Sequence, residues 1–118
     1  MSLLNQGKPA RIKSVAGNNT GTAAEDVYTC PANCRADISF IHVLNVGATN
    51  TITLDWLQAT GSVSTKILSA KSFATGAFEQ FADLRVILTA GDKIRITPGS
   101  SGDVETIVTV TETFNPVG

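Results

Sequence analysis

The chain has 118 residues, 42% of them apolar and only 16% charged, so it can form one domain but not a second core. The net charge is −1, and the lysines and arginines are scattered, which argues against nucleic-acid binding. No apolar run is as long as a membrane span, and the N-terminus lacks a signal-peptide pattern. We therefore expect the product to stay in the compartment where it is made, without contact with a membrane.

The N-terminal third is predicted to hold an arm and two strands. Residues 1–9 have no periodicity and are predicted to form an extended arm. Residues 10–15 alternate apolar and polar side chains, which predicts a first strand, and the turn formers of residues 16–21 predict a loop. Residues 25–30 predict a second strand, which ends at Pro31 because proline has no N–H to donate to a sheet.

The longest predicted strand covers residues 35–46, and its alternation is irregular. Its apolar residues fall on two parities, namely Ile38, Phe40, Leu44 and Val46 on one, and Ile41 and Val43 on the other. Either both faces of this strand are buried, or a bulge near Ser39 and Phe40 reverses the direction of the side chains. Residues 47–50 predict a hairpin loop after it.

The clearest alternation is that of residues 51–56. It predicts that Ile52, Leu54 and Trp56 face the core and that Asp55 faces solvent. Further strands are predicted at residues 63–72, 84–88, 94–96 and 103–114, and residues 76–84 have room for one helical turn at most.

Two details concern the last strands. In the final strand, Val104, Val108 and Val110 are predicted to face inward, and Ile107 suggests a second bulge. Asp92 is predicted to cap a turn, because aspartate readily bonds its own local backbone.

About eight short strands with regularly spaced turns are typical of a sandwich or jelly roll. We therefore expect an all-β, single-domain antiparallel β-sandwich, jelly-roll-like, over residues 10–118, with residues 1–9 as its arm.

The two cysteines, Cys30 and Cys34, have a C-x3-C spacing that matches neither a redox C-x-x-C motif nor a zinc knuckle. His42 is the only histidine, so a zinc site lacks ligands, and no metal or cofactor is expected. The cysteines are interpreted as two small apolar side chains. A short disulfide is the alternative, which a reducing compartment disfavours.

No catalytic constellation is found. His42 is the only candidate base, and its place mid-strand among apolar neighbours favours a core or interface histidine. No spacing singles out a carboxylate pair, and phosphate, dinucleotide and calcium loops are absent from the sequence. Trp56 could stack on a sugar, but its parity places it in the core. An enzyme is therefore not expected.

Several segments carry a resemblance to a known group of proteins. They are Tyr28-Thr29-Cys30-Pro31-Ala32-Asn33, Ile41-His42-Val43-Leu44-Asn45, Leu54-Asp55-Trp56, Leu88-Thr89-Ala90-Gly91-Asp92-Lys93-Ile94-Arg95-Ile96 and the strand from Val104 to Glu112. Over about residues 26–113 the chain resembles small virion proteins of tailed bacteriophages. The resemblance implies a β-sandwich that coats or joins a particle, with Cys30 and Cys34 as free thiols.

The resemblance favours a capsid decoration (cement) protein. Such a protein is made in the host cytoplasm, joins the virion as a homotrimer, and binds and stabilises the shell of major capsid protein. A tail, neck or fibre-associated virion protein and a carbohydrate-binding module are the alternatives. The expected partner contacts are Leu3, Leu4, Lys8 and Arg11 of the arm region, and an exposed loop with Phe78, Glu79 and Phe81.

Overall fold

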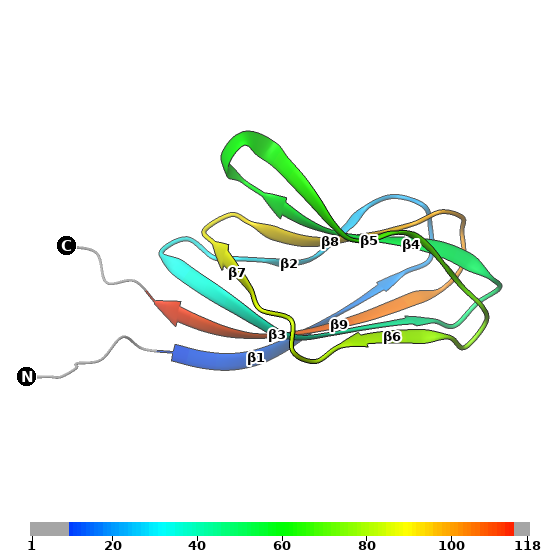
Figure 1. Ribbon diagram of the computed structural model, residues 1–118, viewed down its shortest axis with the longest axis horizontal. Coiled ribbons are helices and arrows are strands. Elements are labelled where there is room, and N and C mark those ends of the chain that lie inside the picture. The colour runs from blue at the N-terminus through cyan, green and yellow to red at the C-terminus, as the bar shows by residue number, and fades with distance from the viewer. Residues whose placement is uncertain (1–9, 115–118) are drawn as a thin grey trace, which may run out of the picture.

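The computed structural model describes residues 10–114, which form two antiparallel sheets packed face to face (Figure 1). The predicted all-β antiparallel sandwich is confirmed. Within the described range the one helical segment is a single 3-10 turn, η1 (Thr60–Ser62). The predicted arm, with Leu3, Leu4 and Lys8, lies outside the described residues.

Each sheet is built from strands that are distant in the sequence. Sheet one has the order β1 (Ala10–Asn19), β9 (Val104–Phe114), β3 (Cys34–Asn45) and β6 (Phe78–Phe81), and β7 (Val86–Thr89) pairs with the other half of β3. Sheet two has the order β2 (Glu25–Thr29), β8 (Lys93–Pro98), β4 (Asn50–Gln58) and β5 (Val63–Phe73). The pairs β4·β5, β3·β6, β2·β8 and β1·β9 nest inside one another along the chain and alternate between the two sheets of the sandwich.

The core lies between the two sheets and consists of the inward side chains of alternating strands. Its fully enclosed apolar members include Ile38, Ile41, Val43, Ile52, Leu54, Leu88, Ile94, Ile96, Val108 and Val110. Burying one such side chain stabilises the fold by about 1.5–3 kcal/mol. The clean alternation of β4, β8 and β9 therefore decides which face of each strand turns inward.

The irregular alternation of β3 is explained by a bulge. Its register with β9 shifts between Ile38 and Phe40, so Ser39 has no partner of its own. Ile38 faces the core before the bulge and Ile41 faces it afterwards, whereas Phe40 points to the outside. The bulge that was one of the two predicted explanations is confirmed.

The second predicted bulge, at Ile107, is wrong. β9 pairs with β1 in unbroken register from Val104 to Thr113, and Ile107 is 39% exposed on the outside of sheet one. The predicted inward set Val104, Val108 and Val110 is confirmed. Ile107 is thus an outward apolar side chain rather than a sign of irregular backbone.

Asp55 and Trp56 differ from the expectation in how far they are covered. Asp55 lies opposite Arg95 on the outer side of β4, as its parity predicts, but only 9% of it is exposed, so the prediction that solvent surrounds it is wrong. The reason is that Ser64 and Lys66 of β5 bond its Oδ2 at 2.9 and 3.1 Å and cover it. Trp56 packs against the core but stays partly exposed.

The exposed loop expected around residues 78–81 is wrong, because these residues form the edge strand β6. β6 pairs antiparallel with residues 41–44 of β3. A four-residue edge strand carries too little alternation to be detected locally, and its partner lies more than 30 residues earlier. The turn role of Asp92 is confirmed, because its carboxylate accepts hydrogen bonds from the backbone N–H of Thr89 (3.1 Å) and Ala59 (3.0 Å).

Candidate interaction surface

The outer side of sheet one gathers apolar and aromatic side chains from four strands. We call this surface the sheet-one face; it comprises Ile12 and Ala16 of β1, Ile107 of β9, Phe40, His42 and Leu44 of β3, and Phe78 of β6. The register places Ala16, Ile107 and His42 in one row across the sheet. Ile12 is 75% and Phe78 60% exposed, so these large side chains stand in solvent in the isolated chain.

An aromatic stack occupies one side of the sheet-one face. The imidazole of His42 lies nearly parallel to the ring of Phe40, at 6.5 Å between centroids, and is tilted against Phe78 at 5.7 Å. Its Nδ1 is 3.1 Å from Nε2 of Gln80. Since no carboxylate of residues 10–114 hydrogen-bonds this ring, it lacks the orienting group of a catalytic base. The predicted core position of His42 is wrong, because the side chain lies on the outer side of sheet one, and its place in an interface stays a prediction.

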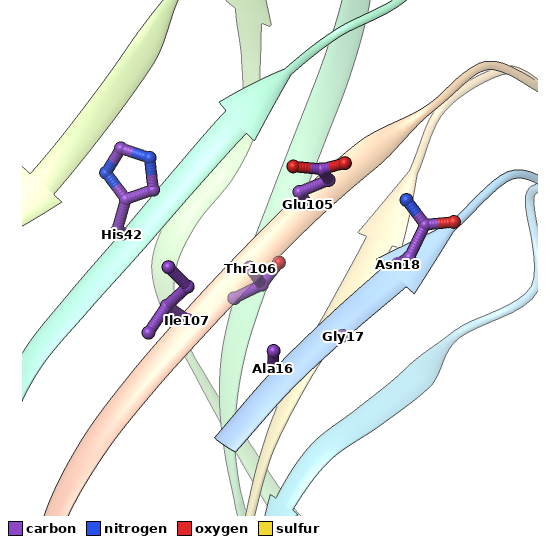
Figure 2. A pocket seen from close by; sticks show the side chains of 7 residues that line it. All are labelled: Ala16, Gly17, Asn18, His42, Glu105, Thr106 and Ile107. Atoms are coloured by element: carbon purple, nitrogen blue, oxygen red, sulfur yellow. The ribbon is translucent and has the colours of Figure 1, made fainter. Parts of the chain in front are cut away.

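A hollow of about 380 Å³ opens beside the aromatic stack. Figure 2 shows that its lining comes from β1, β9 and β3. Ala16 and Ile107 give it apolar walls, whereas His42, Glu105 and Asn18 supply polar groups. The ionisable groups of this lining are one carboxylate and one imidazole on the open side of a sheet.

The outer side of sheet two has the opposite chemistry. Asp26 accepts a hydrogen bond from Nε of Arg95 at 2.7 Å and lies 3.4 Å from Nζ of Lys93. The hydrogen bond from Arg95, together with the charge of Lys93, lowers the pKa of the Asp26 carboxyl against the opposing effect of burial. Lys66 pairs with Asp55 on the same side. These charges satisfy one another, as is usual on a surface that faces water.

A buried polar cluster joins the two sheets near one end of the sandwich. Glu112 of β9 is fully enclosed, and its carboxylate accepts a hydrogen bond from the hydroxyl of Tyr28 (2.5 Å) on β2 and from Nε of Arg11 (2.7 Å) on β1. Nζ of Lys13 lies 3.4 Å away. Burial acts to raise the pKa of Glu112, but the bonds from Tyr28 and Arg11 and the charge of Lys13 outweigh it, so this pKa is lowered. The cluster connects β9 to β1 within sheet one and to β2 of sheet two.

The two cysteines are free and buried, as the apolar interpretation predicts. The thiol of Cys30 lies 3.6 Å from the carbonyl oxygen of Cys34. Burial first, and the nearby Cys34 and Glu112 second, raise the pKa of Cys30 to about 11. Among residues 10–114 no three histidine, cysteine or acidic side chains come together as metal ligands.

The residues expected to contact a partner do not share one surface. Phe78 lies on the sheet-one face, whereas Glu79 pairs with Lys71 and Phe81 packs against the core. Their description as an exposed loop is wrong, because they belong to β6. Arg11 bonds Glu112 at the edge of the sandwich.

Sequence reasoning missed most of the sheet-one face, including Ile12, Phe40 and Ile107. The signal was present at Ile107, an apolar residue on the parity opposite to the buried Val104, Val108 and Val110. An apolar residue of that kind indicates either a bulge or an exposed contact, and the sequence alone does not separate the two. No helix in the described part of the chain is long and apolar enough to cross a membrane.

Comparison with known proteins gives likeness at the level of structure. No protein-family model matches the sequence, and no curated protein matches it. A chain of the cyanophage Pam1 capsid asymmetric unit is 23% identical with a TM-score of 0.51, covering 92% of this chain and 86% of that one. A chain of the acidic stable capsid of Helicobacter pylori bacteriophage KHP30 is 9% identical with a TM-score of 0.54, covering 95% and 93%.

A third solved structure comes from another kind of assembly. A chain of Bacillus endospore appendages, a family of disulfide-linked pili, is 15% identical with a TM-score of 0.55, covering 92% of this chain and 91% of that one. At these identities the likeness shows a shared fold. The chain therefore has a β-sandwich fold that also occurs in chains of phage capsids and of bacterial surface appendages.

Proposed function

We propose that this protein is a bacteriophage virion structural protein that decorates the capsid. In this role it binds the assembled shell of the major capsid protein and stabilises it. The likeness of its fold to chains of two phage capsids and the motifs of residues 26–113 support the class of protein. The observation that carries the proposal is the difference between the two outer sides of the sandwich.

The difference between the two outer sides indicates which of them faces the capsid shell in this proposal. The sheet-one face exposes Ile12, Phe78 and Ile107, and covering such side chains with a protein surface is favourable. The outer side of sheet two instead holds ion pairs such as Asp26 with Arg95, which are stable in water. The protein therefore lies with sheet one against the shell and sheet two toward solvent.

The assembly that suits this role is a homotrimer on a threefold position of the shell. Repeating one modest contact around a closed symmetry axis converts weak single contacts into strong attachment. Leu3, Leu4 and Lys8 in the arm are proposed to contact a neighbouring capsid subunit. Deleting residues 1–9 is then expected to leave the domain folded and to weaken its attachment.

A tail, neck or fibre-associated virion protein is the second candidate. The likeness of its fold to a chain of Bacillus endospore appendages, described as disulfide-linked pili, supports it. Copy number separates the two candidates, since a decoration protein occurs in hundreds of copies per particle and a neck or fibre protein in a few to a few dozen. A carbohydrate-binding module is the remaining alternative: Trp56 packs against the core, whereas Phe78 is exposed as that role needs, and silence on a glycan array would remove it.

The experiment measures attachment to the shell. Capsid shells of the phage that carries this chain are stripped of it and incubated with wild-type protein or with a Phe78→Ser, Ile107→Ser double variant. Removing both side chains from a buried contact forfeits about 2–3 kcal/mol, or about 30- to 150-fold in affinity. Shells that carry wild-type protein are also expected to melt at a higher temperature than bare shells.

The control is Val63→Ser, which removes an apolar side chain that is 49% exposed on β5 of sheet two. It is expected to bind the shell like the wild type. Equal binding by the double variant would show that the sheet-one face is not the attachment surface. Failure of the wild-type protein to bind the shell at all would overturn decoration itself.

A further inference from the structure

β1 is a long edge strand of regular register that carries two cations, Arg11 and Lys13. Within residues 10–114 it pairs only with β9, over ten residues in unbroken register. The other edges are interrupted: β5 has two register shifts against β4, β2 has one and only five residues, and β6 and β7 have four residues each. A long regular edge presents unpaired N–H and C=O groups to any strand that fits it.

We propose that the β1 strands of two copies of this chain pair antiparallel across a two-fold axis, with Ser14 facing Ser14 of the second copy. Side chains that face each other in an antiparallel pair point to the same side of the sheet. This register therefore places Ile12 opposite Ala16 of the second copy on the outer side, and Arg11 opposite Gly17 of the second copy on the inner side.

The strongest argument for a second copy is the charge at Gly17. A Cβ at this glycine would lie 2.9 Å from Oε2 of Glu25, so the Glu25 carboxylate occupies the place where a side chain would be. This carboxylate makes no ion pair among the described residues, and its Oε1 is buried without a hydrogen-bond partner. It is an anion without a cation at the edge of the sandwich.

Arg11 supplies the missing cation from the second copy. Its side chain is 53% exposed, bonds Glu112 through Nε and places its guanidinium carbon 5.3 Å from the centroid of the Phe114 ring, whereas its terminal nitrogens make no hydrogen bond among residues 10–114. Opposite residues of an antiparallel pair have Cβ atoms about 4.5–5.5 Å apart. Arg11 can therefore keep its bond to Glu112 and direct its terminal nitrogens at Glu25 of the second copy. The two-fold axis makes this contact twice.

The apolar side chains and the remaining charge select the same register. Ile12, the most exposed large apolar residue described, gains Ala16 of the second copy as its neighbour. Lys13 faces Val15 of the second copy. Centring the pair on Lys13 would oppose two like charges, and centring it on Val15 would place Ile12 beside a polar Asn18.

This pairing does not depend on the proposed decoration role. It uses an edge of sheet one and leaves most of the sheet-one face uncovered, so a shell can still be bound there. On a closed shell a two-fold contact would connect copies that belong to neighbouring trimers, because two-fold and threefold contacts use different surfaces.

The test is disulfide trapping of purified protein by mild oxidation with diamide. Ser14→Cys is expected to give a covalent dimer on a non-reducing gel, since the two Cα atoms meet at the axis within disulfide range. Ile12→Cys alone and Ala16→Cys alone are matched controls, because each lies about 13 Å from its own copy in this register. A mixture of these two variants is expected to form the dimer that neither forms alone.

The native cysteines are buried, and the unmodified chain and Ser69→Cys on β5 measure background crosslinking. A Ser14→Cys yield no higher than that of Ser69→Cys would overturn the pairing. A covalent dimer of Ile12→Cys alone that matches the Ser14→Cys yield would overturn the register.

A second measurement tests the charge contact. Glu25→Gln is expected to weaken self-association in sedimentation equilibrium about tenfold, because the axis repeats the ion pair. Glu105→Gln, a change of the same size on β9, is expected to leave association unchanged. An unaltered dissociation constant for Glu25→Gln would contradict the contact between Arg11 and Glu25.

Discussion

Replacing Glu112 by glutamine tests the buried polar cluster that joins the two sheets. The carboxylate is fully enclosed and accepts hydrogen bonds from Tyr28 and Arg11. A hydrogen bond to a charged group contributes about 1.5–3 kcal/mol, whereas a neutral one contributes about 1 kcal/mol. Because the cations remain partly exposed and can hydrate, we expect Glu112→Gln to lower the free energy of unfolding by about 2 kcal/mol. For a domain of this size, that lowers Tm by about 8 °C.

The assay is urea unfolding followed by tryptophan fluorescence, with Trp56 as the only tryptophan. Glu105→Gln on the exposed side of the same strand is the control and is expected to stay within about 0.5 kcal/mol of the wild type. Tyr28→Phe is expected to lower the free energy of unfolding by about 1.5 kcal/mol. The double variant is expected to lose less than the sum of the two single losses, because both changes affect the same hydrogen bond.

The dependence of the unfolding free energy on pH gives a second test of the buried polar cluster around Glu112. The pKa of Glu112 is lowered in the folded protein, so its stabilisation is complete above the ordinary value near 4.5 and is lost as pH falls through the lower folded-state pKa. The wild type is therefore expected to lose its advantage over Glu112→Gln below about pH 4.5. An equal unfolding free energy of the two proteins at pH 7 would refute the assignment of Glu112 as a stabilising anion.

Three further predictions follow from the structure. Val108→Ala is expected to lower the free energy of unfolding in urea by about 2 kcal/mol, because Val108 faces the core. Ile107→Ala is expected to lower it by about 0.5 kcal/mol or less, because Ile107 faces solvent. Equal losses in the two variants would contradict the outward direction of Ile107. The Cys30 thiol, with a pKa raised to about 11 and a buried position, is expected to resist iodoacetamide at pH 8 in the folded protein and to react in urea, as mass spectrometry would show. Asp92→Ala is expected to cost about 1–2 kcal/mol, because the N–H groups of Thr89 and Ala59 lose their acceptor, and Asp92→Asn is expected to recover part of it in thermal unfolding.

The parts of the fold that the sequence predicts are those with local signals. The alternation of Ile52, Leu54 and Trp56 and the turn at Asp92 depend on neighbours within a few residues, and both are observed. The irregular alternation of β3 left two explanations open, burial of both faces or a bulge. The structure shows the bulge. Local pattern was not sufficient for β1, because the turn formers of residues 16–21 predicted a loop whereas the strand continues to Asn19 in its pairing with β9.

The rest depends on contacts between distant residues. β6 is recognised as a strand only through its pairing with β3, and the burial of Asp55 depends on β5 folding over it. Glu112 continues the inward parity of Val108 and Val110, but a charged residue is not expected to be buried from its sequence position alone. Its burial is explained only once Tyr28 and the cations of β1 are known to contact it. The sheet-one face was missed for a related reason, because Ile107 is identified as an outward surface residue only when the pairing of β9 with its neighbours is known.

The single unpaired residue in β3 decides which side chains this protein shows to other molecules. If Ser39 took a place of its own in the ladder, every residue after it would turn over, so that Phe40, His42 and Leu44 entered the interior and Ile41 and Val43 came out. Deleting Ser39 itself would remove the bulge and leave the later residues facing as they do, because Ile38 and Phe40 already pair with the neighbouring residues Val110 and Thr109. Deleting a paired residue of β3 beyond the bulge would instead exchange the inside and the outside of the rest of the strand, so Ser39 is the position of this strand where a deletion should be best tolerated.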